Sequence, residues 1–250
     1  MIDIESNPSF KNDIRIYSHS GLANRLRLIA RYKHMSDLTN KKIKMYWVKS
    51  KPCLSPFSDL FYPIQNIDFE YIKWNRTERR TRPKNTAVSL DFFPQDDYTY
   101  KRNHLIFKPL DIIQRQIDYN LDKIGQDFIS CHIRRTDIER VQRKYDIEPH
   151  PDSFFEDFIN SYPDKKVFLA TDSRSTQEKF KNKFRDRMVT HSIVKDDGSK
   201  RWPHRTTSIR EAVVDLFMCI NSSVFLGTNC SSFSGFIRNY KEGITCQQEA

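Results

Sequence analysis

The sequence predicts an α/β protein of two halves, each built on a mainly parallel sheet. Short apolar segments typical of buried strands alternate along the chain with segments of helical periodicity. Aromatic residues make up 13% of the 250 residues, and their large side chains supply the buried area that a core needs, which excludes a disordered chain. We expect the first half to span residues 1–110 and the second half to span residues 111–250.

The first half begins with a strand, a turn and a helix. Residues 14–18 are expected to form the strand, His19-Ser20-Gly21 the turn, and residues 24–36 the helix. Residues 42–48 alternate apolar and polar side chains, which predicts a second strand. Residues 49–110 are rich in proline, aromatic and charged residues with poor periodicity, so short helices, loops and at most one or two strands are expected there.

The second half continues the alternation of helix and strand. Apolar residues recur at helical spacing from Ile113 to Ile124, and Gly125 is suited to end that helix. Asp152 or Ser153 is expected to cap a later helix. Further strands are expected at residues 128–133, 167–170 and 223–226, and further helices near residues 154–159, 180–188, 208–219 and 231–240.

Two of these helices carry a local signature. Ser208 and Glu211 have the spacing of a capping box, which predicts a helix start. The helix near residues 180–188 is expected to bury a stripe of Phe180, Phe184 and Met188 and to expose its basic residues to solvent.

The charge of the chain is strongly basic. Lys and Arg total 42 against 32 Asp and Glu, which gives a formal net charge of +10. A basic balance favours nucleic acid or a phosphate-bearing small ligand as partner. The basic residues cluster at residues 76–84, in an expected loop, and at residues 179–187, on the amphipathic helix.

The cysteines and the termini bear on the compartment. The five cysteines are scattered and form no Cys-x-x-Cys pair, which argues against a disulfide framework or a zinc site. No apolar run approaches the roughly 20 residues of a membrane-spanning helix. Residues 1–12 are polar and lack the apolar segment of a signal peptide. We therefore expect a cytoplasmic protein without a membrane span.

Polar residues follow three of the expected strands. In open α/β sheets ligands bind at the carboxyl ends of the strands. Arg134 and Arg135 follow one strand, Asp172 follows the next, and a run of small and hydroxyl residues at 227–236 follows a third. Arginine offers a planar fork to phosphate, and a helix start offers backbone N–H groups. The residues alone leave open a second interpretation, in which the arginine pair only bridges to Asp137.

Five segments together resemble the α1,2-, α1,6- and protein O-fucosyltransferases. His132-Ile133-Arg134-Arg135-Thr136-Asp137 resembles their His-x-Arg-Arg-x-Asp signature, and Ala170-Thr171-Asp172-Ser173 resembles the next motif. Residues 205–215 resemble the Arg-x-Thr…Asp segment, and residues 225–234 resemble the Ser-Ser-Phe segment. Residues 21–26 resemble the N-terminal Gly-x-Gly-Asn loop, with Ala23 where a second glycine is usual. The order of the segments also fits, whereas residues 49–110 carry no such motif.

The resemblance implies a fold and a reaction. The expected fold is GT-B-like, with two Rossmann-like domains facing across a cleft, in a minimal version. The first would be the acceptor side, and the second would bind the nucleotide sugar. The expected reaction transfers fucose from GDP-fucose to a glycan or protein acceptor, with inversion and without a metal or other cofactor. No nucleic-acid partner is expected.

The resemblance also implies roles for individual residues. Arg134 is expected to hold the β-phosphate and to stabilise charge as the sugar–phosphate bond breaks. Arg135 is expected to support the same loop by pairing with nearby acids, and both arginines are the candidate catalytic residues. The expected GDP-fucose contacts are His132 and Asp215 at the guanine, Ser231, Ser232 and Phe233 at the phosphates, Asp172 in the second motif, and Gly21 and Asn24 in the first domain.

One position departs from the family pattern. The α1,6 enzymes carry a candidate general base, a glutamate, ten residues after the motif histidine, where this chain has Gln142. Glu139, Asp146 and Glu148 lie nearby, but no motif matches them, so the base stays open. Two alternatives also stay open: a transferase that uses another GDP-hexose, and a basic module that binds nucleic acid or an anionic glycan.

Overall fold

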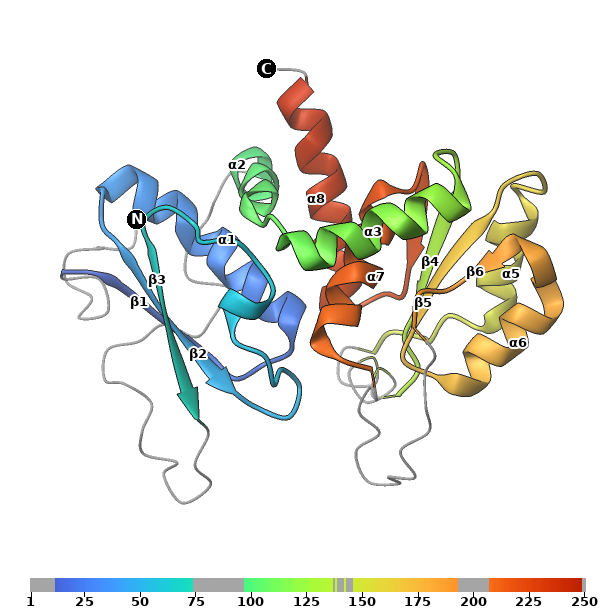
Figure 1. The fold of residues 1–250 in the computed structure, drawn as a ribbon, viewed down its shortest axis with the longest axis horizontal. Coiled ribbons are helices and arrows are strands. Elements are labelled where there is room, and N and C mark those ends of the chain that lie inside the picture. The colour runs from blue at the N-terminus through green and yellow to red at the C-terminus, as the bar shows by residue number, and fades with distance from the viewer. Residues whose placement is uncertain are drawn as a thin grey trace. The chain divides into compact units, whose positions relative to one another are not determined.

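The chain divides into two compact units, each built on its own sheet. The computed structural model describes residues 12–73, 97–136, 138, 142, 146–192 and 207–248. Unit 1 comprises Met1–Leu110 and Asn239–Ala250, and unit 2 comprises Asp111–Arg238 (Figure 1). The division after Leu110 coincides with the expected domain boundary. The residues from Asn239 onward cluster with unit 1, whereas the sequence placed them in the second domain.

Unit 1 contains a three-stranded parallel sheet in the order β1-β2-β3. Strand β1 (Ile14–Ser18) leads into helix α1 (Leu22–Thr39), which returns the chain to β2 (Ile43–Lys49), and β3 (Ile67–Lys73) forms the other edge. Strands β1 and β2 can pair in parallel because helix α1 supplies the long crossover connection that parallel neighbours need. Other elements among the described residues of unit 1 are the 3₁₀ turns η2 (Phe57–Asp59) and η3 (Asn103–Ile106) and the short helix α2 (Asp97–Arg102).

The C-terminal part of α8 (Ser232–Gln248) packs on α2, which explains its place in unit 1. Lys101 forms an ion pair with Glu242 at 2.6 Å. A Cβ atom on Gly243 would lie only 2.5 Å from the carbonyl oxygen of Lys101, so the two backbones approach as closely as a glycine allows. These contacts join residues far apart in the sequence, and no local pattern indicates them.

Unit 2 contains a four-stranded parallel sheet in the order β6-β5-β4-β7. Its strands are β4 (Ile129–Ile133), β5 (Val167–Thr171), β6 (Met188–Val189) and β7 (Val224–Gly227). The helices of unit 2 whose bounds the structure describes are α3 (Asp111–Ile124), α5 (Asp152–Asn160), α6 (Arg174–Phe184), α7 (Ile209–Asn221) and the start of α8, with the 3₁₀ turn η4 (Arg185–Arg187) after α6.

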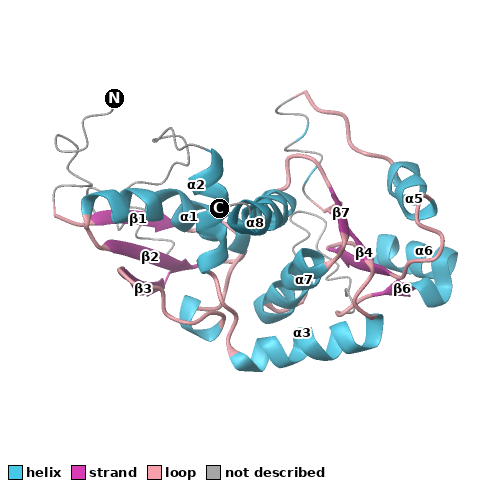
Figure 2. Cartoon of the chain, turned by 90° about the horizontal axis from the view of Figure 1, so that it is seen from above, coloured by secondary structure: helices cyan, strands magenta, loops and turns pink. Residues whose placement is uncertain are grey.

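Helices cover both faces of this sheet (Figure 2). Helices α5 and α6 bury Phe155, Ile159 and Phe180 against β4 and β5. Helices α7 and α3 lie on the other side, where α7 contacts β4 and β5 and α3 packs on α7. Such a doubly covered sheet leaves only the strand ends and their loops open to a ligand.

Several local predictions are confirmed. Strand β1 has the expected bounds, and α3 ends at Ile124, directly before Gly125, whose φ of 91° suits a glycine. Ser208 and Glu211 form the capping box, because Ser208 Oγ accepts from the Glu211 N–H at 3.2 Å and Glu211 Oε2 accepts from the Ser208 N–H at 2.5 Å. Cys131 and Cys219 are buried free thiols.

Two local predictions are wrong. The N-cap of α5 is Pro151, so neither Asp152 nor Ser153 caps this helix, and the Asp152 carboxylate instead pairs with Arg135. Met188 does not continue the stripe of α6, because the helix ends at Phe184 and Met188 lies in the edge strand β6. Arg185, with a φ of 46°, reverses the chain between them.

Basic residues of the cluster at 179–187 form ion pairs and hydrogen bonds with neighbouring groups of unit 2. Lys179 and Lys183 pair with acids on α5, and Arg187 donates to the carbonyl oxygens of Ile159 and Tyr162. The other cluster, residues 76–84, lies outside the described residues. Within the described ranges, no helix has both the length and the apolar character to cross a membrane.

Candidate active site

Three loops meet at the carboxyl edge of the unit 2 sheet. Strand β4 pairs in parallel with β5 on one side and with β7 on the other. The loops that follow these strands therefore emerge side by side, and they carry most of the polar residues singled out in the sequence.

Asp172, after β5, organises the loop after β4. Its Oδ1 accepts from the backbone N–H of Arg135 at 2.8 Å, and its Oδ2 accepts from Thr136 Oγ1 at 2.6 Å. Arg134 Nε lies 3.9 Å from the same Oδ2 atom. Through two short hydrogen bonds and a longer ion pair, the Asp172 carboxylate thus holds residues 134–136, the arginine loop, in its conformation.

Thr228, after β7, holds the same loop from the other side. Thr228 Oγ1 accepts from the backbone N–H of Arg134 at 3.0 Å and donates to the carbonyl oxygen of His132 at 3.1 Å. The backbone N–H of Thr228 donates to the same carbonyl at 3.0 Å. The backbone on both sides of Ile133 is therefore fixed to the β7 loop.

His132 packs against the start of α8. Its Nδ1 lies 2.8 Å from Ser234 Oγ, and its ring lies 4.6 Å from the ring of Phe233. A Cβ atom on Gly227 would lie 2.5 Å from Ser234 Oγ. Only glycine at this position lets Ser234 approach the sheet and reach the histidine.

Ser231 has an unpartnered hydroxyl at the start of α8. The residue is 3% exposed, and its Oγ has no hydrogen-bond partner among the described residues. Its carbonyl oxygen accepts from the Gly235 N–H at 2.9 Å, within the first turn of the helix. The first N–H groups of a helix lack partners within it and favour an anion. The orphaned hydroxyl and the helix start together indicate an anion-binding position, to which Ser232 and Phe233 belong as the first residues of α8.

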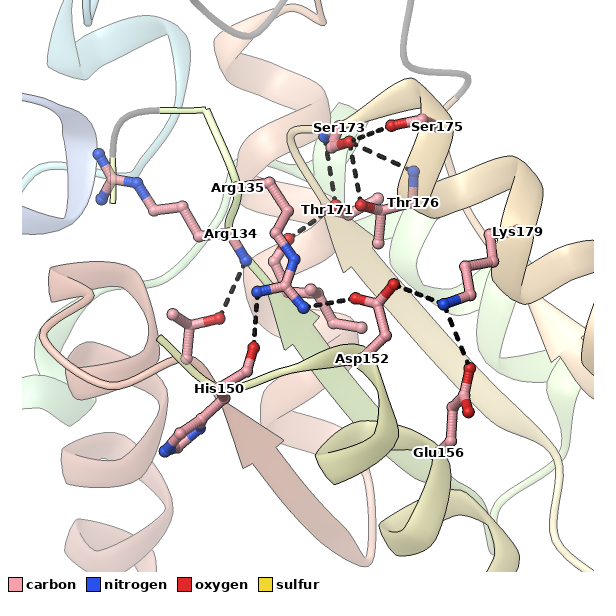
Figure 3. Close-up of polar contacts among 12 residues, drawn as sticks. Arg134, Arg135, His150, Asp152, Glu156, Thr171, Ser173, Ser175, Thr176 and Lys179 are labelled. Carbon is pink, nitrogen blue, oxygen red and sulfur yellow. Dashed lines mark hydrogen bonds and ion pairs between the residues drawn. The ribbon is translucent and has the colours of Figure 1, made fainter. Parts of the chain in front are cut away.

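The two arginines point in different directions (Figure 3). The Arg135 guanidinium donates to the carbonyl oxygen of His150 at 2.8 Å and to Asp152 Oδ1 at 2.5 Å. The Arg134 side chain extends away from that cluster, and 26% of its surface is exposed. The Arg135 side chain is almost equally exposed, at 23%, so the direction of the side chains and not their exposure distinguishes the pair.

Asp152 is the acid that Arg135 pairs with. Burial alone raises the pKa of Asp152, but the hydrogen bonds and positive charges of Lys179 and Arg135 hold it below its ordinary value. Lys179 Nζ lies 2.8 Å from Asp152 Oδ2. The carboxylate therefore stays ionised and bridges the arginine to α6.

Comparison with known proteins identifies the family. The sequence model of the GDP-fucose protein O-fucosyltransferases matches residues 18–243, which is most of the chain. The chain belongs to this family. It is thus a GDP-fucose-dependent glycosyltransferase. A search of curated proteins finds no match.

Solved fucosyltransferases share the fold of this one. NodZ α-1,6-fucosyltransferase soaked with GDP-fucose aligns at a TM-score of 0.61 and 16% identity, over 90% of this chain and 91% of that chain. NodZ from Bradyrhizobium aligns at 0.58 and 17% identity, over 90% and 91%. POFUT1 in complex with GDP aligns at 0.60 and 10% identity, over 92% and 95%. The α/β fold of GT-B type is confirmed.

The other candidate residues of the fucosyltransferase belong to helices α7 and α1 or to parts of the chain that the structure does not describe. Asp215 is 2% exposed in α7, where the structure places it in the packed interior of unit 2. Gly21 and Asn24 belong to unit 1, with Gly21 as the N-cap of α1 and Asn24 in its first turn. Asp137, in the signature, and Arg205 lie outside the described residues.

Gln142 is buried, and both polar atoms of its amide lack a hydrogen-bond partner within the described part of the chain. The acids near it in sequence behave differently, since Asp146 and Glu148 are exposed. Glu139 lies outside the described residues. The described residues also contain no group of three or more His, Cys, Asp or Glu suited to hold a metal ion.

Sequence reasoning missed the residues that support the site. Ser234 and Asn229 lie within a segment that the sequence singled out, but their spacing alone does not reveal their partners. His150 has no motif around it. The signal near it in the sequence is Pro151, a residue typical of a helix start.

Proposed function

We propose that this fucosyltransferase moves fucose from GDP-fucose to a hydroxyl group of a glycan or protein acceptor, with inversion at the anomeric carbon and without a metal ion. The observation that carries the proposal is the connection between Arg134 and the start of α8. The Arg134 backbone bonds to Thr228, which lies in the loop that leads to the orphaned hydroxyl of Ser231. A side-chain cation and a helix start are thus held at one sheet edge.

These groups supply what a departing diphosphate requires. In the proposed reaction the bond between the anomeric carbon and the phosphate oxygen breaks, and negative charge grows on the β-phosphate of GDP. Ser231 Oγ and the first N–H groups of α8 would bind the diphosphate in the ground state. The Arg134 guanidinium would contribute most in the transition state, because its charge meets charge that is still developing. In this proposal, positive charge from the protein stabilises the diphosphate in the place of a metal cation.

The reaction also requires a group that takes the proton of the acceptor. The acceptor hydroxyl must lose its proton as its oxygen bonds to the anomeric carbon. Gln142 stands where α1,6 enzymes have a candidate base, and an amide takes up no proton near neutral pH. The proton therefore passes to another group. Unit 1 is the proposed acceptor side, and its Gly21 and Asn24 are proposed contacts to GDP-fucose.

The test uses the purified protein with GDP-fucose and arrayed glycans and peptides. We expect fucose transfer that is unchanged by EDTA, and calorimetric binding of GDP in preference to UDP and ADP. Loss of transfer with EDTA, restored by manganese, would contradict the metal-independent mechanism. Transfer from another GDP-hexose but not from GDP-fucose would contradict GDP-fucose as the donor. A cytoplasmic location stays a prediction, for which the free cysteines suit a reducing compartment.

A further inference from the structure

The segment His150-Pro151-Asp152 contacts the loop after β4. Two different nitrogen atoms of Arg135 donate hydrogen bonds to this segment, one to the carbonyl oxygen of His150 at 2.8 Å and one to Asp152 Oδ1 at 2.5 Å. The guanidinium also lies over the buried ring of Phe155 in α5, 5.7 Å from its centre. Arg135 is thus fixed at its charged end by groups of its own protein (Figure 3).

The same segment contacts the loop after β7. Asn229 Nδ2 lies 2.8 Å from His150 Nε2. The imidazole packs on Phe154, with ring centres 4.0 Å apart. Burial, and then the positive charge of Arg135, lower the pKa of His150, which favours the neutral ring that can accept from an amide N–H.

The segment is itself anchored to rigid elements. Pro151 restricts its own backbone and begins α5. Asp152 is tied to Lys179 of α6, and Lys179 and Lys183 both pair with Glu156 one turn further along α5. Charged side chains of alternating sign therefore form a continuous series of ion pairs from the arginine loop across α5 to α6.

We propose that His150-Pro151-Asp152 is a positioning segment that holds the loops after β4 and β7 in register, and that Arg135 acts on fucose transfer through this segment and not by touching the donor. The inference rests on the proposed function for its catalytic consequence. Its structural part, the fixing of two loops by one turn, is independent of that function.

The consequence for catalysis follows from the neighbours of the two contacts. Arg135 directly follows Arg134, and Asn229 lies two residues before Ser231. A shift of either loop would move the Arg134 guanidinium relative to the hydroxyl and helix start that bind the diphosphate. Displacements of about 1 Å at a reacting centre cost up to about a hundredfold in rate. Binding of GDP in the ground state tolerates such a shift better, because it depends less on the developing charge.

Two variants separate the two contacts, and a third is the matched control. Asp152→Asn removes the charge that holds Arg135 and keeps the shape of the side chain. His150→Ala removes the ring contact with Asn229 and keeps the backbone carbonyl oxygen that accepts a hydrogen bond from Arg135. Glu156→Gln breaks ion pairs of Lys179 and Lys183 in the same chain of charges but contacts neither loop.

Hydrogen exchange measured by mass spectrometry tests the structural part. We expect Asp152→Asn to speed exchange in residues 133–136, and His150→Ala to speed it in residues 228–232, with neither change in Glu156→Gln. Exchange that is unaltered in both loops would overturn the proposal, whether or not the protein transfers fucose. If Asp152→Asn does not fold, His150→Ala alone decides this part.

Kinetics with GDP-fucose test the catalytic part through the pair Arg135 and Asp152. We expect Asp152→Asn to lower kcat by about tenfold to a hundredfold, with a smaller change in KM. The double variant Arg135→Lys with Asp152→Asn should be no slower than the slower single variant, since both changes break one connection. Rate losses that multiply would show that Arg135 touches the donor directly and would overturn the proposal. A wild-type protein that binds GDP but transfers no fucose would refute the proposed function, while the exchange experiment would still judge the segment.

Discussion

The hydroxyl of Thr228 bonds the backbone of Arg134, with 3.0 Å between Thr228 Oγ1 and the Arg134 nitrogen. This single contact joins the exits of two neighbouring strands. Since Thr228 also donates to the carbonyl oxygen of His132, it fixes the peptide groups that precede the arginine. The direction in which Arg134 leaves the sheet thus depends on a residue more than ninety positions away in the sequence.

Thr228→Val should therefore damage the site while keeping the shape of the side chain. It leaves the Arg134 N–H and the His132 carbonyl without the hydroxyl, and we expect the free energy of unfolding to fall by about 1–3 kcal/mol. The transfer rate should fall by about tenfold or more, because the arginine loop loses a fixed point. Urea unfolding and steady-state kinetics measure the two effects.

Thr228→Ser is the control, since it keeps the hydroxyl and loses only a methyl group. It should retain most of the activity. Equal losses in the valine and serine variants would mean that packing of the methyl group, and not the hydrogen bond, is what matters.

Asp215 offers a test of base recognition. We expect Asp215→Asn to weaken GDP binding by roughly 1–3 kcal/mol, the cost of disturbing a buried polar contact, and to leave the weak binding of UDP almost unchanged. Titration calorimetry with both nucleotides measures the difference. If both nucleotides lose the same affinity, Asp215 serves the packing of α7 and not the recognition of guanine.

His104 in unit 1 predicts a pH dependence of stability. Burial, and then the charges of Arg27 and Arg31, lower the pKa of His104 from 6.5 to about 4, against the hydrogen bond with the Tyr100 carbonyl oxygen. Between these values the unfolded chain binds a proton that the folded chain does not. The free energy of unfolding should thus be unaffected above about pH 6.5 and fall as the pH drops toward 4, by about 3 kcal/mol in total.

His104→Gln removes this titration. Urea unfolding at several pH values between 4 and 7 should give a flatter dependence for the variant than for the wild type. Parallel curves for the two proteins would show that His104 does not carry the effect.

The sequence predicted the elements that local patterns encode. The capping box at Ser208 and the glycine after α3 are short-range signals with direct physical causes. The motif residues after β4, β5 and β7 lie at one edge because adjacent parallel strands bring their carboxyl ends together. Alternation of strand and helix was enough to predict that arrangement.

Other features depend on contacts that no local pattern carries. Met188 continues the spacing of Phe180 and Phe184, and no glycine marks the end of α6, since Arg185 itself takes a positive φ. Asp152 is of a residue type that often caps helices, but its carboxylate forms an ion pair with Arg135 from another loop. The role of His150 arises only from Asn229, which the fold brings beside it.

The transfer rate of Arg134→Lys tests the central claim most directly. Lysine keeps the positive charge but lacks the planar fork, so it cannot rebuild a two-point contact with the diphosphate. Together with Arg134→Ala as the full deletion, it should lower kcat by at least about 100-fold, or roughly 3 kcal/mol of barrier, while GDP affinity falls by less. Asp172→Asn, which alters the support of the loop, should leave more activity than either. A folded Arg134→Lys protein that transfers fucose at a near-normal rate would contradict the mechanism proposed for this enzyme.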